Sequence, residues 1–257
     1  MLRELKKSDW LELLNLTGNM VPHALILRGT RNLKGQYQAH LPHFEETVHV
    51  GSPNGVFEDV LVGRHRGVRI GYASVYGAAM ASEITHLFGV LGTRLVIQTG
   101  CCGALAAELA TGDLFVAEEA FCGEGAAHYY MPGATTVRTS IALDNWRALR
   151  SATDIPLHCG RIYTTSALLA EGHQELESWS DAGCAAVDME TATTFAVAEH
   201  FGMDRASILF VFDNPRQNHH MLLSDAQRDE RRARANGRMI ELALQMAVHH
   251  AAKSLTS

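Results

Sequence analysis

Val187-Asp188-Met189-Glu190-Thr191-Ala192 places two carboxylates two residues apart, where an apolar run ends and a helix-like run begins. At such a strand-to-helix junction the backbone turns, so both Asp188 and Glu190 can project from the carboxyl end of a sheet. Open α/β sheets bind their ligands at that edge. The stretch therefore predicts an α/β fold with an acidic ligand site. The alternative is that both carboxylates cap the following helix and complement its dipole.

Short β-rich runs recur along the chain, and helical stretches separate many of them. This rhythm predicts an α/β protein with a largely parallel or mixed sheet. The last predicted helix has Ser224 as its N-cap. No repeat or linker divides the chain, so residues 1–257 are predicted to form a single domain. We expect strands at 24–27, 68–74, 94–99, 113–117, 157–162, 185–188 and 207–212, and helices at 78–91, 141–151, 190–201 and 225–253.

The composition favours a small-molecule ligand. The 257 residues are 47% apolar, and 28 acidic against 22 basic side chains give a net charge of −6 without long runs of either sign. No surface for nucleic acid or an anionic membrane is therefore expected. No run reaches the roughly 18 apolar residues of a membrane helix, and the charged N-terminus has no signal core, which predicts a cytoplasmic protein. Five cysteines without Cys-x-x-Cys spacing indicate neither a disulfide framework nor a metal site.

Two further segments follow apolar runs with residues suited to chemistry. In Gln98-Thr99-Gly100-Cys101-Cys102-Gly103-Ala104, glycines after a predicted strand let backbone N–H groups approach an anion or a sugar closely. In Phe212-Asp213-Asn214-Pro215, a partly desolvated carboxyl at a strand end can have a raised pKa and protonate a leaving group. Both segments are also typical of ordinary turns, which favour glycine, Asp, Asn and Pro.

Together with the Asp188-Met189-Glu190 motif, these segments resemble the nucleoside phosphorylase-I superfamily, which includes uridine phosphorylases, hexameric purine nucleoside phosphorylases and purine nucleosidases. The resemblance covers about residues 25–248 and implies a three-layer α/β/α domain around a central mixed sheet, assembled as a homo-oligomer such as a hexamer or dimer. It implies that Glu190 binds the ribose 2′ and 3′ hydroxyls, that Asp188 and Met189 bind beside the sugar, and that Asp213 protonates N7 of a purine. It implies no cofactor, with phosphate as the co-substrate.

The glycine loop differs from the family at two phosphate-binding positions. Gln98 occupies the position of a family arginine, and Cys101 occupies that of a hydroxyl residue. A neutral amide and a thiol cannot make the charge-assisted hydrogen bonds that a phosphate dianion favours. The resemblance implies that this loop lies beneath the ribose and that backbone near Gly100 and Gly29 cradles the nucleophile.

The first predicted turn differs as well. Gly29 matches the family's phosphate turn, but Leu33 takes the place of its arginine. Arg28 and Arg31 lie close enough in the sequence to replace it. In the family, a neighbouring subunit contributes a further phosphate-binding arginine, which the resemblance places within residues 49–60. This segment contains no arginine. We therefore expect phosphate binding to be absent or weak unless Arg28 or Arg31 compensates.

Two other positions concern contacts with the ligand. The run from Gly123 to Pro132 resembles a Glu-Gly-x-x-x-His-Tyr-x-Pro segment of a uridine-phosphorylase-like branch, and His128 within it is predicted to contact the ligand. Leu168 takes the position at which family members carry an aromatic residue that stacks on the base.

The sequence and the resemblance together predict cleavage of the N-glycosidic bond of a nucleoside, with a purine nucleoside favoured and with phosphate or water as the nucleophile. A hydrolytic nucleosidase without phosphate dependence is one alternative. A catalytically inactive protein that binds nucleosides through the same ribose and base contacts is another.

Overall fold

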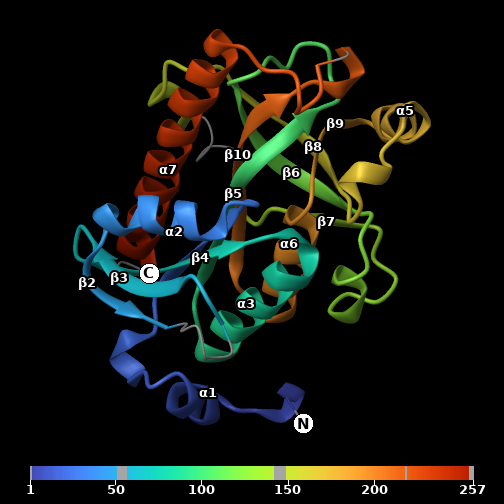
Figure 1. Cartoon of the computed structure of the whole chain (residues 1–257). Coiled ribbons are helices and arrows are strands. Elements are labelled where there is room, and N and C mark those ends of the chain that lie inside the picture. Colours follow the sequence, from blue (N-terminus) through green and yellow to red (C-terminus); the bar gives the residue numbers. More distant parts are fainter. Residues whose placement is uncertain (1, 51–56, 142–148, 218, 255–257) are drawn as a thin grey trace.

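A computed structural model describes residues 2–50, 57–141, 149–217 and 219–254. Strands and helices alternate through the central part of the chain, as the sequence predicts (Figure 1). The strands are β1 (Ala24–Gly29), β2 (Glu45–His49), β3 (Val60–His65), β4 (Val68–Val75), β5 (Leu95–Ala104), β6 (Leu114–Cys122), β7 (Thr136–Arg138), β8 (Leu157–Thr164), β9 (Cys184–Asp188) and β10 (Asp204–Asp213). The helices include α1 (Lys7–Leu13), α2 (Leu33–His40), α3 (Gly77–Leu91), α5 (His173–Asp181), α6 (Thr191–His200) and α7 (Ala226–Ser254), with 3₁₀ segments such as η4 (Ala127–Tyr129) and η5 (Leu168–Ala170).

The ten strands form one mixed sheet in the order β10-β6-β8-β9-β5-β1-β4-β3-β2, with β7 paired to β6. β4, β1, β5 and β10 are joined by parallel pairs, and β2 and β3 extend the sheet in antiparallel fashion. Because β5 pairs with both β10 and β9, the strands β5, β10, β6, β8 and β9 close into a ring. β1, β4, β3 and β2 continue from this ring as an open sheet.

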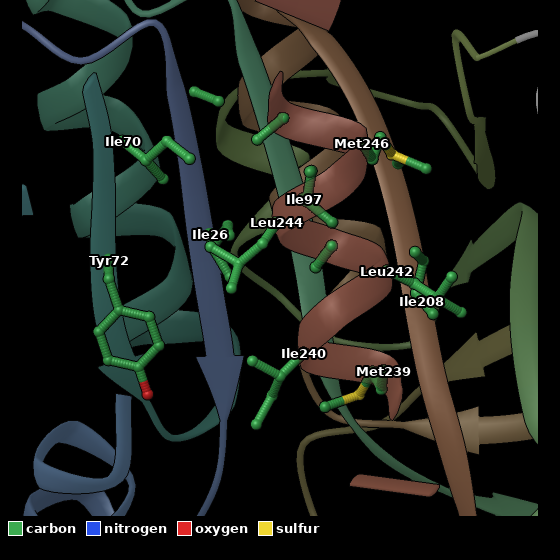
Figure 2. Packing of buried hydrophobic residues seen from close by; sticks show 14 of the residues in the cluster. Ile26, Ile70, Tyr72, Ile97, Ile208, Met239, Ile240, Leu242, Leu244 and Met246 are labelled. Atoms are coloured by element: carbon green, nitrogen blue, oxygen red, sulfur yellow. The ribbon is translucent and has the colours of Figure 1, made fainter. Parts of the chain in front are cut away.

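One face of the sheet packs against α7. Side chains alternate between the two faces along each strand, so every second residue points toward this helix. On its side facing the sheet, α7 carries apolar residues at helical spacing. The core so formed contains Ile26, Ile70, Tyr72, Ile97 and Ile208 from four strands and Met239, Ile240, Leu242, Leu244 and Met246 from α7 (Figure 2).

The opposite face is covered by α3 and α6. Leu25 and Leu27 of β1 lie in a cluster with residues of α3 such as Leu87 and Phe88. α6 is buried continuously from Thr191 to Ala198, because it lies between α3 and the sheet. Helices on both sides of a mixed sheet confirm the predicted three-layer α/β fold.

All seven predicted strands are present, and the helices predicted at 78–91, 190–201 and 225–253 correspond to α3, α6 and α7. Most of the helix predicted at 141–151 lies outside the described residues. The predicted N-cap of α7 was wrong: Asp225 accepts a 2.9 Å hydrogen bond from the N–H of Arg228, while Ser224 bonds to side chains further along the helix. None of the helices in the described ranges has the length and apolar character needed to cross a membrane.

Candidate active site

Several strand ends meet at one edge of the sheet. β1, β5 and β10 run parallel and bring Gly29, Gly100 and Asp213 toward their carboxyl ends. β9 reaches the same edge through the pairing of Val187 with Gly103, so the turn that contains Glu190 follows there. The three segments that the sequence singles out therefore come together in space.

Glu190 occupies the position just before α6, but its side chain does not cap that helix. Its Oε1 accepts a 2.8 Å hydrogen bond from the backbone N–H of Gly77, the first residue of α3. The residue is only 6% exposed. The carboxyl group thus lies at the N-termini of two helices, where free N–H groups and helix dipoles favour negative charge.

Gly29 and Gly100 have no side chains, and this provides the space that the carboxyl group of Glu190 occupies. A Cβ atom on Gly29 would stand 2.7 Å from Glu190 Oε2 and 3.2 Å from Gln98 Nε2. A Cβ atom on Gly100 would stand 3.1 Å from the carbonyl oxygen of Gly29. Only glycine permits such close approach of β1, β5 and Glu190. The N–H of Gly100 does not point at this space, because it donates to Met239 Sδ at 3.4 Å.

Burial and the nearby charge of Asp188 raise the pKa of Glu190 to about 8, while the N–H of Gly77 and the charge of Arg28 act in the opposite direction. Near neutral pH Glu190 is therefore largely protonated when no ligand is bound. A ligand that brings hydroxyl donors or positive charge favours the ionised form.

Asp188 is bound by protein donors on both oxygens. Oδ1 accepts from Thr164 Oγ1 at 2.7 Å, and Oδ2 accepts from the N–H of Thr191 at 2.9 Å and from its hydroxyl. Burial raises the pKa of Asp188, and these hydrogen bonds oppose that effect. For Asp188 the geometry favours the helix-capping alternative, and its direct contact with a ligand stays a prediction. By fixing the start of α6, Asp188 also fixes the direction of Glu190.

Gln98 is completely buried, and its amide already has protein partners. Oε1 accepts a 2.8 Å hydrogen bond from Thr194 of α6, and Nε2 donates to the carbonyl of Thr99 at 2.9 Å. The side chain therefore holds α6 against β5. It offers a ligand no charge and at most one remaining N–H.

Asp213 ends β10 opposite Gly103, and its Oδ1 would lie 3.3 Å from a Cβ atom on that glycine. No described donor forms a hydrogen bond to its half-buried carboxyl group. Burial raises the pKa of Asp213 to about 6, while the charges of Arg232 and His220 oppose the rise. Arg232 is held beside it by a 2.8 Å bond from Nε to the carbonyl of Phe212. A carboxyl group with this pKa can give up and recover a proton near neutral pH.

Arg28 points toward α7, unlike the neighbouring Gly29, because successive residues of a strand face opposite sides. Its Nη2 donates to Asn236 Oδ1 at 2.7 Å, and its guanidinium lies 5.7 Å from the ring centroid of Phe210. It is 4% exposed, and its Nε has no partner among the described residues. The expectation that Arg28 binds a ligand beside Gly29 therefore does not fit this geometry. Its positive charge instead lowers the pKa of Glu190.

Arg31 is the exposed arginine of this turn. Its guanidinium lies 5.3 Å from the ring centroid of Tyr76, which immediately precedes Gly77. Cys101 is also open to solvent, and the surrounding protein raises the pKa of its thiol to about 11, so it stays neutral. Leu33, at the position where the resemblance places an arginine, begins α2. Arg31 is thus the cation of this turn with access to a ligand.

Leu168 begins η5, and Met189 is half-buried in the turn between β9 and α6. Glu171 follows η5, and nothing in the sequence distinguishes it from a surface acid. Its Oε1 is buried without a hydrogen-bond partner among the described residues, and burial together with the charge of Asp213 raises the pKa of Glu171 to about 7. A second carboxyl group with a raised pKa therefore lies in the loop that follows β8.

His128 is exposed on η4. Its neighbour Tyr130 forms a 3.1 Å hydrogen bond to His86, which lies nine residues along α3 from Gly77, or about 13 Å at 1.5 Å per residue. No described contact brings His128 to the other site residues, and its role stays a prediction.

The carboxyl groups of Glu190 and Asp213 determine what the site can do chemically. Within residues 2–50, 57–141, 149–217 and 219–254, no group of three or more His, Cys, Asp or Glu side chains is arranged to hold a metal ion. Glu190 can accept hydrogen bonds from hydroxyls and stabilise a developing cation, and Asp213 can supply a proton.

Residues 26–247 match the profile of the phosphorylase superfamily. A guanosine phosphorylase of Halorubrum lacusprofundi is 31% identical over 139 residues, which span 54% of this chain and 58% of that protein. A purine nucleoside phosphorylase of the DeoD type from Geobacillus kaustophilus is 26% identical over 201 residues, covering 74% of this chain and 79% of that protein. The crystal structure of uridine phosphorylase from Vibrio fischeri has the same fold, with a TM-score of 0.74, 21% identity, and coverage of 90% and 92% of the two chains.

Proposed function

Because this chain belongs to the phosphorylase superfamily and is an enzyme of the nucleoside phosphorylase type, we propose that it cleaves the N-glycosidic bond of a purine nucleoside with phosphate as the nucleophile. One observation carries the proposal: the same sheet edge holds a buried carboxyl group, Glu190, and a half-buried acid, Asp213, whose pKa is raised to about 6. Cleavage of an N-glycoside needs negative charge beside the sugar and a proton for the departing base.

Glu190 binds the sugar in this proposal. Its Oε1 is held by Gly77, so Oε2, which faces Gly29, accepts hydrogen bonds from the ribose 2′ and 3′ hydroxyls. The half-buried Met189 packs against the same sugar. As the bond from C1′ to the base breaks, positive charge grows on the sugar ring. The attraction to ionised Glu190 grows with it, which lowers the barrier as well as aiding binding.

In this proposal Asp213 is the acid that donates a proton to the departing base. A proton from its carboxyl group goes to N7 of the purine as the electron pair of the glycosidic bond moves onto the base. The opposing effects of burial and of Arg232 leave its pKa near 6, so a fraction of the molecules carries the proton at neutral pH. A pyrimidine has no N7, which is why the proposal names a purine.

The phosphate contacts are fewer than those that the family resemblance implies. Leu33 and Gln98 stand in place of two arginines, and Arg31 is the exposed cation near Gly77. Each lost charge-assisted contact is worth roughly 1.5–3 kcal/mol. Two such losses weaken phosphate binding by about 10²- to 10⁴-fold before any gain from Arg31. We therefore expect phosphorolysis that needs a high phosphate concentration.

A second candidate, hydrolysis, is favoured by the state of Gln98. Its amide is bound to Thr194 and Thr99, so the loop holds no spare positive charge for an anion. Water attacking C1′ would release free ribose from the same Glu190 and Asp213 pair.

The proposal is tested with a panel of purine and pyrimidine nucleosides incubated with the full chain in high phosphate, with base release followed by chromatography. Purine release by the wild type, reduced by about 10²-fold or more in Asp213→Asn, is the expected result. Release of pyrimidines alone, or no release with a folded protein, would overturn it.

A further inference from the structure

Glu171 presents an unsatisfied carboxyl oxygen. It follows η5 and is half-buried, and no described donor reaches its Oε1, which solvent does not reach either. Leaving a buried acceptor without a donor is unfavourable by about 1–3 kcal/mol. A structural role would pair this oxygen with a protein donor, as Asp188 is paired. This oxygen therefore keeps its capacity to accept a hydrogen bond from a ligand donor.

Glu171 belongs to the loop that leaves the carboxyl end of β8, where the N–H of Thr165 donates a 2.9 Å hydrogen bond to the carbonyl of Asp188, two residues before Glu190. Burial and, after it, the charge of Asp213 raise the pKa of Glu171. Leu168, three residues earlier, lies in the same short 3₁₀ segment. Around the pair, Arg232 of α7 and His220 act on Asp213. Glu171 thus follows β8 at its carboxyl end and Asp213 ends β10, and both strands belong to the ring.

The chemistry of purines limits what Glu171 can bind when Asp213 takes N7. The group next to N7 on that edge is the substituent at C6. Adenine carries an amino donor there, whereas guanine and hypoxanthine carry an oxygen acceptor. An ionised carboxylate only accepts hydrogen bonds, so it pairs with the amino group and repels the oxygen.

We propose that Glu171 is a specificity-determining residue whose buried carboxylate oxygen accepts a hydrogen bond from the 6-amino group of the base, so that 6-aminopurine nucleosides are preferred over 6-oxopurine nucleosides. This inference rests on the proposed function, because it needs a purine whose N7 faces Asp213. A site built to bind a donor discriminates strongly against a ligand that lacks it.

Adenosine and inosine differ at this position and are the probes. At pH 8, where Glu171 is ionised, the wild type is expected to cleave adenosine with a kcat/KM at least about 10-fold above that for inosine. In Glu171→Gln, the amide can donate to the C6 oxygen, so the ratio should fall about 10-fold or more. Glu177→Gln is the matched control, since Glu177 is exposed on α5, five residues beyond Gly172, and Glu171 precedes that helix. The control should keep the wild-type ratio.

Lowering the pH gives a second readout. Below about pH 7 Glu171 gains a proton and can donate to the C6 oxygen, so the adenosine preference of the wild type should decline while that of Glu171→Gln stays flat.

The outcomes separate this inference from the proposed function. If the wild type cleaves purine nucleosides and Glu171→Gln leaves the ratio within about 2-fold, the role of Glu171 is refuted and the function stands. A wild-type preference for inosine at pH 8 refutes it equally. If the folded wild type cleaves no purine nucleoside, both fail together. Thermal unfolding of the three proteins shows whether a change in ratio comes from misfolding.

Discussion

Replacing Glu190 with glutamine tests the sugar contact, because the substitution keeps the size of the side chain and removes its charge. Oε1 accepts from the Gly77 N–H, and Oε2 faces Gly29. In Glu190→Gln the amide oxygen must take the Gly77 N–H, since an NH₂ group cannot accept it. The NH₂ group then faces Gly29, and the sugar hydroxyls meet a donor where they had met an acceptor.

The magnitude follows from the two hydroxyls. Each loses a charge-assisted hydrogen bond of roughly 1.5–3 kcal/mol and recovers about 1 kcal/mol by accepting from the amide. A net loss of about 1–4 kcal/mol lowers kcat/KM for a ribonucleoside by about 5- to 10³-fold. A 2′-deoxynucleoside offers one hydroxyl, so its kcat/KM should fall by only about 2- to 30-fold.

The assay is base release from matched ribonucleosides and 2′-deoxynucleosides. Glu199→Gln is the control on the same helix, since Glu199 is exposed and forms an ion pair with Arg205. It should keep wild-type activity, and thermal unfolding should show that Glu190→Gln is folded. Equal losses below about 5-fold for both sugars in a folded variant would refute the sugar contact and leave Glu190 with a structural role.

Three further predictions concern protonation and space. Because the active form needs Asp213 protonated and Glu190 ionised, kcat/KM of the wild type should rise up to about pH 6, stay level between about pH 6 and 8, and fall above about pH 8. In Asp213→Asn the rise of kcat/KM should continue to about pH 8. A profile that is unchanged in this variant would exclude Asp213 as the acid. Gly29→Ala should lower kcat/KM by about 10-fold or more in a folded protein, because its Cβ atom would meet Glu190 Oε2, and normal kinetics would show that the carboxyl group moves freely. Burial and the charge of His250 lower the pKa of His23, so below about pH 6.5 the unfolded chain binds more protons than the folded chain. The melting temperature of the wild type should therefore fall toward about pH 5, and that of His23→Gln should fall by less. Equal falls in the two proteins would contradict this.

The sequence predicts the central elements because their signals are local. Strands such as Ile208 to Phe212 are apolar runs, and α7 repeats apolar residues at helical spacing. β2 could not be predicted because it is a short edge strand with charged residues such as Glu45. β3 lies between β2 and β4, but its apolar run is short and is followed at once by Gly63 and Arg64. α5 could not be predicted for a similar reason, since it buries only Leu176.

The site could be predicted in its parts but not in its contacts. The motif around Glu190 and the position of Asp213 follow from where strands end. No spacing rule reveals that Gly77 would hold Glu190, since this contact joins residues 113 positions apart. The direction of Arg28 depends on which face of β1 meets α7, and the burial of one oxygen of Glu171 depends on packing between loops. Tertiary contacts of this kind have no signature in a single sequence.

The identity of the sugar product tests the central claim most directly. The full chain is incubated with a purine nucleoside over a series of phosphate concentrations, including none, and the sugar is identified by phosphorus NMR and mass spectrometry, with Asp213→Asn as the blank. The account predicts ribose 1-phosphate, formed at a rate that saturates only at a phosphate concentration about 10²-fold or more above that needed by an arginine-bearing relative assayed alongside. Free ribose, released at the same rate with and without phosphate, would contradict it.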